Sequence, residues 1–369
     1  MSKTREDIKT TKKRIVCFHL YNDYSGAPLV LSEIIEGLDA KGYEVELFTS
    51  GKYSKGFLSK LDHVEYHYSH YKWTATRYIN YLRFFINQFL LFFKLLVYIR
   101  KDVVFYVNTL WPFAAGMAGK LMGKRVIYHL HETSVKPKWL KRFLFRTLDK
   151  SATDIIYVSN YLKQKDPVKQ TKQHVVYNAL SPDFTENIKP RENSDEFTVL
   201  MLCSLKMYKG IKEFIQIAAR LTNIKFDLVV SANDEELNAY FKNDRFSENM
   251  SLHATQVDVH PFYERASLVL NLSHPDKWLE SFGLTVLEAM HYGVPAIVPP
   301  IGGISELVKD GYNGYKISVK DLDQITNTIH QLSEDKALHK ELSQHAKEMA
   351  KHFNYQSMID RIENIILDK

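Results

Sequence analysis

The sequence predicts an α/β protein of two Rossmann-like domains, each with a doubly wound parallel sheet, that face each other across a central cleft. Three observations lead to this fold class. Short apolar runs alternate with amphipathic helical patterns along the chain. The alternation starts a second cycle after a polar stretch at 181–196, which has the composition of an interdomain linker. The length of 369 residues also suits two ordinary domains.

The two cycles define the expected domains. We expect an N-terminal domain at 1–185 and a C-terminal domain at 186–354. The final helical segment, 355–369, is expected to pack back on the N-terminal domain.

Each predicted strand is a short apolar run, as expected for strands buried in a parallel sheet, and each predicted helix is longer and amphipathic. In the first cycle, the strands are predicted at 14–20, 43–50, 102–108, 125–131 and 154–159, and the helices at 28–41, 113–122 and 138–150. In the second cycle, the strands are predicted at 197–204, 225–231, 268–273 and 296–300, and the helices at 211–221, 284–291 and 356–367.

The composition is that of a globular protein, with 45% hydrophobic and 25% charged residues. The net charge of +6 suits anionic donors, lipid-phosphate acceptors or a membrane surface, but it is too diffuse to indicate nucleic-acid binding. Cys17 and Cys203 lie in apolar runs and are expected to be buried, reduced thiols. The polar N-terminus is followed by an apolar run too short for a signal peptide, which predicts a cytoplasmic location.

The apolar segment 77–101 is open to more than one interpretation. Polar residues, among them Arg83 and Lys94, interrupt it and argue against a transmembrane helix. Burial in a domain core is the first interpretation. In-plane contact with a bilayer, encouraged by the flanking basic residues, is the second.

A pair of glutamates lies in the region with the strongest chemical pattern, 278–308. Glu280 precedes a glycine turn at Gly283, and Glu288 lies about one turn inside the helix that follows. A glycine turn that opens a helix presents free N–H groups and the positive end of the helix dipole, which suits a diphosphate. The two carboxylates can then address different ends of one ligand. On spacing alone, a surface glutamate and a helix-face glutamate explain the same pattern equally well.

This region resembles the donor-site signature of the GT4 glycosyltransferases, which have the GT-B fold. The signature consists of an E-x7-E motif, a G-x-P motif and a GG-x-x-E loop, which are found here as Glu280 and Glu288, 293–295, and Gly302, Gly303 and Glu306. Further segments resemble the family in the expected order: 24–28 (YSGAP), 129–133 (HLHET), 177–184 (YNALSPDF) and 204–210 (SLKMYKG).

The resemblance implies a role for each matching residue. It makes the N-terminal domain the acceptor side and the C-terminal domain the donor side, with a nucleotide-diphosphate sugar as the donor substrate. Glu288 would bind the ribose hydroxyls, and Gly26 would allow close approach of the diphosphate or acceptor. His131 would hydrogen-bond the donor sugar, and Lys209 would contact the diphosphate. The transferred sugar and its phosphates would be held by Glu280 and by the backbone of Phe282, Gly283, Leu284 and Thr285. His131, Glu280 and Lys209 are thus the expected catalytic residues.

One position departs from the family pattern. Where the family has an arginine five residues before the Lys209 position, this sequence has Ser204. A cation close to a diphosphate stabilises the leaving group. Either Lys206 restores the second charge, or one lysine suffices.

No cofactor and no metal site are expected. Asp321 and Asp323 precede a helical pattern, where capping is the simpler interpretation. The resemblance implies transfer with retention of configuration. The aromatic, basic helix at 84–98 suggests a lipid-linked acceptor, with a saccharide as the other expected acceptor, in surface polysaccharide or glycolipid assembly. The apolar segment 77–101 and its flanking basic residues allow membrane contact, with the protein at the inner face of the membrane. Two alternatives stay open at this point. One is another GT-B enzyme, such as a sugar-nucleotide epimerase or a phosphorylase, and the other is an inactive, membrane-associated binding protein.

Overall fold

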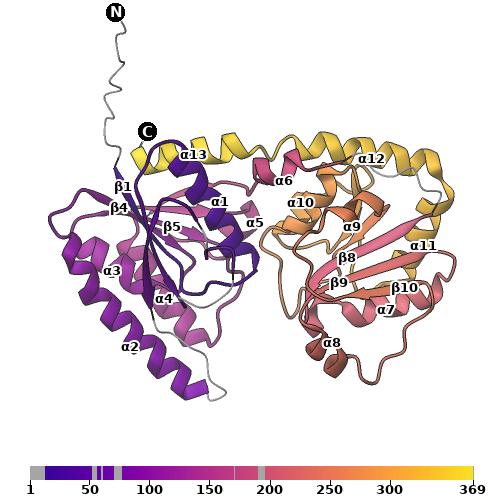
Figure 1. The fold of residues 1–369 in the computed structure, drawn as a ribbon, viewed down its shortest axis with the longest axis horizontal. Coiled ribbons are helices and arrows are strands. Elements are labelled where there is room, and N and C mark those ends of the chain that lie inside the picture. The colour runs from indigo at the N-terminus through magenta and orange to yellow at the C-terminus, as the bar shows by residue number, and fades with distance from the viewer. Residues whose placement is uncertain are drawn as a thin grey trace, which may run out of the picture. The chain divides into compact units, whose positions relative to one another are not determined.

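The computed structural model describes residues 13–51, 56–59, 61–69, 77–169, 171–189 and 196–368. The chain forms two compact units, which are described separately (Figure 1). Unit 1 comprises Met1–Tyr157, Asp166–Val176 and Ile359–Lys369, and unit 2 comprises Val158–Lys165 and Tyr177–Met358. The units therefore divide before the expected boundary at residue 185.

Unit 1 is built on a seven-stranded parallel sheet with the order β3-β2-β1-β4-β5-β6-β7. Its strands are β1 (Arg14–Phe18), β2 (Val45–Ser50), β3 (Val64–Ser69), β4 (Val103–Asn108), β5 (Arg125–Leu130), β6 (Asp154–Tyr157) and β7 (Lys172–Val175). The five predicted strands are all present in the sheet interior. The two edge strands, β3 and β7, were not predicted, because they are half-buried and lack a continuous apolar run.

The helices of unit 1 are α1 (Gly26–Ala40), α2 (Arg77–Leu95), the short η1 (Leu96–Tyr98), α3 (Phe113–Leu121) and α4 (Lys138–Ser151). Helix α13 (Tyr355–Leu367) also contributes its residues from Ile359 onward. Its acidic residue Glu363 accepts hydrogen bonds from Lys41 Nζ at 2.6 Å and from Tyr43 OH at 2.9 Å. At the next turn, Arg125 Nε donates to the carbonyl oxygen of Ile365 at 3.1 Å.

Unit 2 has a six-stranded parallel sheet with the order β10-β9-β8-β11-β12-β13. Its strands are β8 (Thr198–Ser204), β9 (Lys225–Ser231), β10 (Met250–His253), β11 (Leu268–Leu270), β12 (Ala296–Val298) and β13 (Gly314–Lys316). Its helices are α5 (Asn160–Lys165), α6 (Pro182–Glu186), η2 (Met207–Lys209), α7 (Ile211–Arg220), α8 (Asp234–Tyr240), α9 (His260–Arg265), α10 (Leu284–His291), η3 (Gly303–Glu306), α11 (Leu322–Glu334) and α12 (Lys336–Ala350). The expected linker at 181–196 contains α6, and its residues 190–195 lie outside the described part of the chain.

Both sheets have the doubly wound order in which the winding direction reverses between two central strands. The reversal lies between β1 and β4 in unit 1 and between β8 and β11 in unit 2. In such sheets, ligands bind beyond the carboxyl ends of the strands at the reversal. The predicted Rossmann-like fold class is therefore confirmed, and the topology points to one site in each unit.

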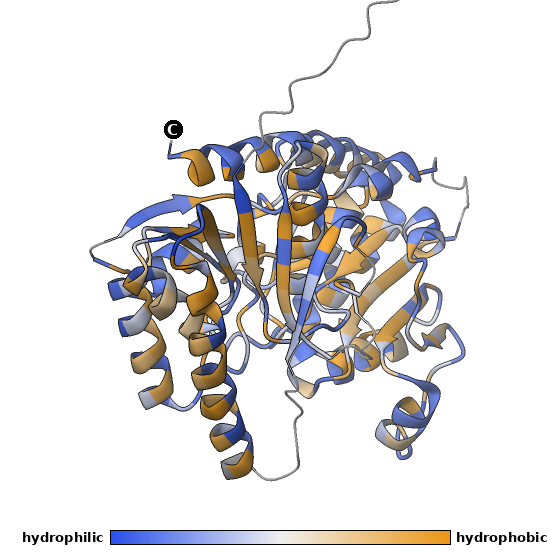
Figure 2. Ribbon diagram, turned by 60° about the vertical axis from the view of Figure 1, so that its left-hand side comes forward, coloured by the Kyte–Doolittle hydropathy of each residue, from blue (hydrophilic) through white to orange (hydrophobic). Residues whose placement is uncertain are grey.

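The prediction that 77–101 is buried in a core is wrong. Helix α2 buries its polar residues Asn80 (3% exposed) and Gln88 (1%), while Leu82 (62%) and Phe89 (63%) are largely exposed. Figure 2 shows the hydrophobic colour along this helix. By length and composition alone, Ile79–Tyr98 is apolar enough to cross a membrane, and only 22% of its most apolar stretch is buried. Helix α2 thus buries polar side chains together with Phe84 and Leu95, and it leaves much of its apolar surface exposed, which is unusual for a surface helix.

The cysteine prediction is correct for Cys17, which is buried in β1, and only partly correct for Cys203, which is half-buried. Both thiols are free. Cys203 lies next to the last residue of β8, where the strand leaves the core of unit 2.

Candidate active site

In unit 2, Lys209 and Glu280 form an ion pair at the carboxyl ends of β8 and β11. Lys209 Nζ donates to Glu280 Oε1, and Ser273 Oγ donates to the same oxygen at 2.8 Å. The side chains of Lys209 and Glu280 are only 17% and 15% exposed. Because the two charges neutralise each other, Lys209 can hold an anionic ligand when that ligand replaces Glu280 as its partner.

Glycines bring the backbone segments of this site into close contact. Gly210, which follows Lys209, has a φ of +80°, and a Cβ there would lie 2.3 Å from the carbonyl oxygen of Leu272. Gly303 N–H donates to the Glu280 carbonyl oxygen at 2.8 Å, and a Cβ at Gly303 would lie 1.8 Å from the Ser281 carbonyl oxygen. The paired glycines of the GG-x-x-E loop therefore allow that loop to pack directly on the backbone that carries Glu280.

Helix α10 begins beside this loop, directly after Gly283. Gly283 has a φ of +106°, and a Cβ there would collide with the side chain of Ile304 at 2.6 Å. Phe282 is buried against Phe353 and fixes the start of the helix. Leu284 and Thr285 form the first turn, whose N–H groups are not used within the helix. These N–H groups and the helix dipole provide a place for phosphate oxygens.

Glu288 is held by a buried tyrosine on α9. Tyr263 OH donates to Glu288 Oε2 at 2.5 Å and also lies 3.2 Å from the carbonyl oxygen of Thr285. Burial raises the pKa of Glu288 above its ordinary value, and the hydrogen bond from Tyr263 partly offsets this rise. The carboxylate is half-buried in the middle of α10, with its other oxygen left to accept further hydrogen bonds.

The two remaining predicted residues of this site lie in the turn between β8 and α7. Ser204 ends β8 and is half-buried. Lys206 is exposed, and its backbone N–H donates to the Ser204 carbonyl oxygen at 2.7 Å. Lys209 is thus the lysine of this turn that the structure pairs with Glu280.

Glu306, the glutamate of the GG-x-x-E loop, has a structural role in unit 2. Its Oε1 accepts from Tyr161 N at 2.6 Å, and its Oε2 accepts from Asn160 N at 3.1 Å and from Tyr177 OH at 2.8 Å. The N–H groups of Asn160 and Tyr161 lie at the start of α5, so Glu306 caps that helix although it is far away in the sequence. This contact explains why 158–165 belongs to unit 2.

Three side chains form a hydrogen-bonded chain at the strand ends of unit 1. Asn108, the last residue of β4, accepts from His131 Nε2 at 2.9 Å through its Oδ1. Its Nδ2 lies 2.9 Å from His19 Nδ1 and 3.2 Å from the carbonyl oxygen of Ala27. Ala27 follows Gly26, the exposed first residue of α1, so Asn108 links the predicted residues Gly26 and His131.

These hydrogen bonds indicate which ring nitrogen of His131 carries a proton. The amide of Asn108 can accept at Oδ1 only from a protonated His131 Nε2, which leaves His131 Nδ1 as an acceptor. Burial lowers the pKa of His131 well below its ordinary value, and it lowers the pKa of His19 to about 4 and that of His129 to about 3. Unit 1 therefore presents neutral imidazoles, suited to hydrogen bonds with hydroxyl groups.

Glu132 lies directly beside His131 and ties two loops together. Its Oε1 accepts from Leu110 N at 2.8 Å, and its Oε2 accepts from His131 N at 3.3 Å. The residue before Leu110, Thr109, has a positive φ of 78°, which is unusual for a threonine. Burial raises the pKa of Glu132 to about 7.

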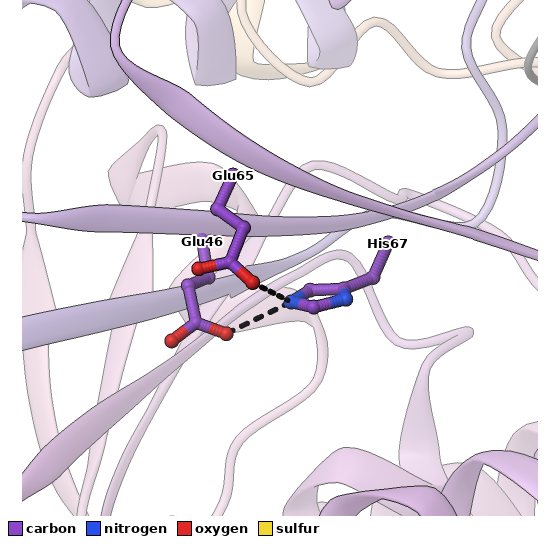
Figure 3. A group of neighbouring side chains, drawn as sticks. All are labelled: Glu46, Glu65 and His67. Carbon is purple, nitrogen blue, oxygen red and sulfur yellow. Dashed lines mark hydrogen bonds and ion pairs between the residues drawn. The ribbon is translucent and has the colours of Figure 1, made fainter.

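One group of side chains in the described part of the chain has the spacing of metal ligands. Glu46, Glu65 and His67 bring ligand atoms within 4.8 Å of one another (Figure 3). However, Glu46 Oε1 already accepts from Arg14 Nη1 at 3.0 Å, and its Oε2 accepts from Tyr98 and lies 2.9 Å from His67 Nε2. These hydrogen bonds hold the pKa of Glu46 below its ordinary value although burial would raise it. The group is therefore an ion-pair network rather than a cation site.

Sequence reasoning missed three residues that shape these sites. Asn108 and Ser273 are single polar residues at or near strand ends, and Tyr263 lies in a short helix without a strong pattern. For Asn108 and Ser273, the position at or just after the carboxyl end of a strand at the reversal was the available signal, since such residues meet a ligand. Tyr263 lies on α9, before β11, and gave no such signal. Asp321, by contrast, caps α11 as predicted, because its side chain accepts from Gln324 N.

Solved structures of other proteins share this fold. The Anabaena protein Alr3699/HepE in complex with UDP and glucose has 18% identity and a TM-score of 0.79, over 97% of this chain and 100% of that chain. Sucrose-phosphate synthase from Thermosynechococcus elongatus has 15% identity and a TM-score of 0.78, over 97% and 99%. At such identities the likeness shows the fold alone, which is that of the GT-B glycosyltransferases.

Family models match both halves of the chain. The model described as glycosyl transferases group 1 matches residues 183–349, and the model described as glycosyltransferase family 4 matches residues 24–184. The chain belongs to the group 1 glycosyltransferases, and the resemblance to the GT4 type is confirmed.

Relatives of known sequence include glycosyltransferases from several organisms. An uncharacterized glycosyltransferase of Methanocaldococcus jannaschii is 24% identical, over 72% of this chain and 76% of its own length. The N-acetyl-α-D-glucosaminyl L-malate synthase of Bacillus anthracis is 26% identical, over 48% of this chain and 46% of its own length. An Escherichia coli UDP-Gal:α-D-GlcNAc-diphosphoundecaprenol α-1,3-galactosyltransferase is 31% identical, over 26% and 24%.

Proposed function

We propose that this glycosyltransferase moves a sugar from a nucleotide-diphosphate sugar to an acceptor hydroxyl, with retention of configuration and without a metal ion. The arrangement of Lys209, Glu280 and the start of α10 supports this proposal best. A lysine and a helix N-terminus can together carry the charge of a leaving diphosphate, which is the task that a divalent cation performs in other enzymes.

The residues of unit 2 then divide the donor between them. The diphosphate would lie against the first turn of α10 and take Lys209 as its counter-ion. Glu280 would turn to the sugar hydroxyls, and Glu288 would accept hydrogen bonds from the ribose through its half-buried carboxylate. In a front-face reaction, the glycosidic bond loosens while the acceptor attacks on the same side, and a phosphate oxygen takes the acceptor proton. Glu280 acts here by position and charge.

The proposed acceptor is a lipid-linked or saccharide hydroxyl used in surface polysaccharide or glycolipid assembly. The Escherichia coli relative is named for an acceptor on diphosphoundecaprenol. In this chain, the outward apolar face of α2 supports in-plane contact with the cytoplasmic surface of a membrane. Arg100 and Lys101, both exposed, follow this helix and suit an anionic lipid surface.

Thermal melting with nucleotides tests the donor site. We expect one of UDP, GDP, ADP, dTDP or CMP to raise the melting temperature by several degrees without magnesium, since a ligand at 100 times its dissociation constant adds about 2.7 kcal/mol. Lys209→Ala should lose most of this shift. Lys225→Ala, an exposed lysine of the same unit, should keep it. Sedimentation of the same proteins with anionic lipid vesicles tests the membrane contact.

The outcomes separate the proposed function from its alternatives. Product formation that requires an acceptor, with the anomeric configuration of the donor kept in the NMR spectrum of the product, supports a retaining transferase. Donor conversion without an acceptor would instead indicate an epimerase. If no nucleotide shifts the melting temperature, the donor site is refuted and the binding-protein alternative takes its place.

A further inference from the structure

Unit 1 contains a cavity of about 650 Å³ beneath helix α2. Its floor is formed by the carboxyl ends of the first three strands, and one side is formed by α2. Much of the lining is apolar, from Phe18, Leu20, Phe48, Ile86, Leu90 and Leu91. This volume lies in the range of cavities that hold small organic ligands.

A buried amide in this lining lacks a hydrogen-bond partner. Gln88 is 1% exposed and lines the cavity. Its Oε1 accepts from Ala114 N at 3.1 Å, which fixes the orientation of the amide and leaves Nε2 as the donor. Among the described residues, Nε2 has no partner. An unsatisfied buried donor is costly, and a ligand with an acceptor oxygen would remove this cost.

Two cations on α2 also line the cavity. Arg83 has no ion pair within the described part of the chain. Lys94 lies with its Nζ 5.2 Å from the centre of the Phe48 ring. Lys94 follows Arg83 by eleven residues, which corresponds to about 16 Å along a helix. The cavity thus combines apolar walls with positive charge, which fits an anionic amphiphile rather than a free sugar or a purely apolar molecule.

The cavity is connected to the candidate catalytic residue of unit 1. His19 is one of the lining residues. It bonds to Asn108, which accepts from His131 Nε2. A ligand that contacts His19 in the cavity would therefore be separated from the Asn108–His131 pair only by the His19 side chain. The apolar face of α2 also continues outward from the cavity, through residues such as Phe89.

We propose that this cavity binds the lipid-phosphate part of the acceptor, an isoprenoid-type chain esterified to phosphate or diphosphate. The chain would lie along Leu90 and Leu91, and a phosphate oxygen would accept from Gln88 Nε2 and pair with Arg83 or Lys94. This assignment rests on the proposed function, because it supplies the acceptor of that same reaction. It adds a location and a chemical class, which the donor-site residues do not provide.

Calorimetric titration with farnesyl diphosphate, in the absence of donor, tests the assignment. We expect farnesyl diphosphate to bind at least about tenfold more tightly than inorganic diphosphate, because each buried methylene contributes to affinity. It should also bind more tightly than farnesol, which lacks the charge. Arg83→Ala should weaken binding about fivefold. Arg146→Ala, an exposed arginine of α4 outside the cavity lining, should leave it unchanged.

A second pair of variants tests the apolar walls. Leu90 and Leu82 are about equally exposed on α2, at 61% and 62%, but only Leu90 lines the cavity. Leu90→Trp should weaken farnesyl diphosphate binding about fivefold or more by filling the cavity, and Leu82→Trp should not. Melting curves of each variant show that the fold is retained.

Three results would overturn the assignment. One is equal affinity for farnesyl diphosphate and inorganic diphosphate. Another is that the lining variant, Arg83→Ala or Leu90→Trp, weakens binding of farnesyl diphosphate no more than its control variant does. The third is loss of binding in Lys209→Ala, which would move the ligand to the donor site of unit 2. Each can occur while nucleotide binding and transfer to a soluble acceptor persist, so failure of the cavity is distinguishable from failure of the proposed function.

Discussion

Replacing Gly303 by alanine should damage both the stability of unit 2 and donor binding. A Cβ at this position would lie 1.8 Å from the Ser281 carbonyl oxygen and 2.6 Å from Ser159 Oγ. The backbone must therefore shift, which costs about 1–3 kcal/mol for overpacking. The shift also breaks the hydrogen bond from Gly303 N to the Glu280 carbonyl oxygen, worth about 1 kcal/mol. We expect a total loss of about 3 kcal/mol in the free energy of unfolding.

Gly311 provides a matched control in the same unit. It has a φ of +69°, and a Cβ there would meet nothing within 4 Å. Gly311→Ala therefore carries only the cost of a left-handed backbone, about 1 kcal/mol. Gly303, in contrast, has no positive φ, so its cost is steric. The pair separates the two reasons for which a glycine is required.

Thermal melting and nucleotide titration together measure these effects. For a domain of this size, 1 kcal/mol corresponds to about 2–4 °C, so Gly303→Ala should lower the melting temperature by about 6–12 °C and Gly311→Ala by about 2–4 °C. Gly303→Ala should also weaken nucleotide binding at temperatures where it is folded, because the backbone of Glu280 moves. A smaller loss of stability for Gly303→Ala than for Gly311→Ala would refute the reasoning.

Two further variants address single carboxylates. Because burial raises the pKa of Glu132 to about 7, the folded protein binds an extra proton between the unfolded pKa and pH 7, so its stability should fall as the pH rises over that interval and level off above 7. Glu132→Gln should flatten this dependence in melting curves from pH 5.5 to 8; parallel curves would contradict the assignment. Tyr263→Phe removes the hydrogen bond to Glu288 and should weaken binding of a ribose-containing nucleotide about five- to tenfold by calorimetry. Tyr292→Phe, whose hydroxyl bonds to His260, is the control, and equal losses in both variants would argue against a role for Tyr263.

The buried centre of each sheet was predictable because its strands carry continuous apolar runs. β1, β4, β8 and β9 all lie where the sequence placed them. The edge strand β3 was not predictable in this way, because its sequence VEYHYS mixes polar and aromatic residues and remains half-buried. Strands at an edge are defined by their hydrogen-bond partner, here β2, which local periodicity does not reveal.

Helix α2 shows a second limit of sequence patterns. Periodicity identifies two faces of a helix but does not say which one points inward. The general preference for apolar burial did not reveal that Gln88 is buried beside Phe84, with a partner in the Ala114 backbone, while Phe89 is exposed. The candidate site shows the same limit: Lys209, Glu280 and Glu288 were recognisable by spacing and resemblance, whereas Asn108 and Tyr263 became visible only through their tertiary contacts.

The composition of unit 1 has a consequence for how the protein folds during synthesis. Domains usually fold in the order in which they leave the ribosome. Here the first unit includes Ile359–Lys369, which are translated after all of unit 2. Until then, Lys41 and Tyr43 lack Glu363, and Arg125 lacks the Ile365 carbonyl oxygen. The half that is translated first is thus completed last, so a nascent chain halted before residue 359 would carry an unfinished first unit beside a second unit that already has all its residues.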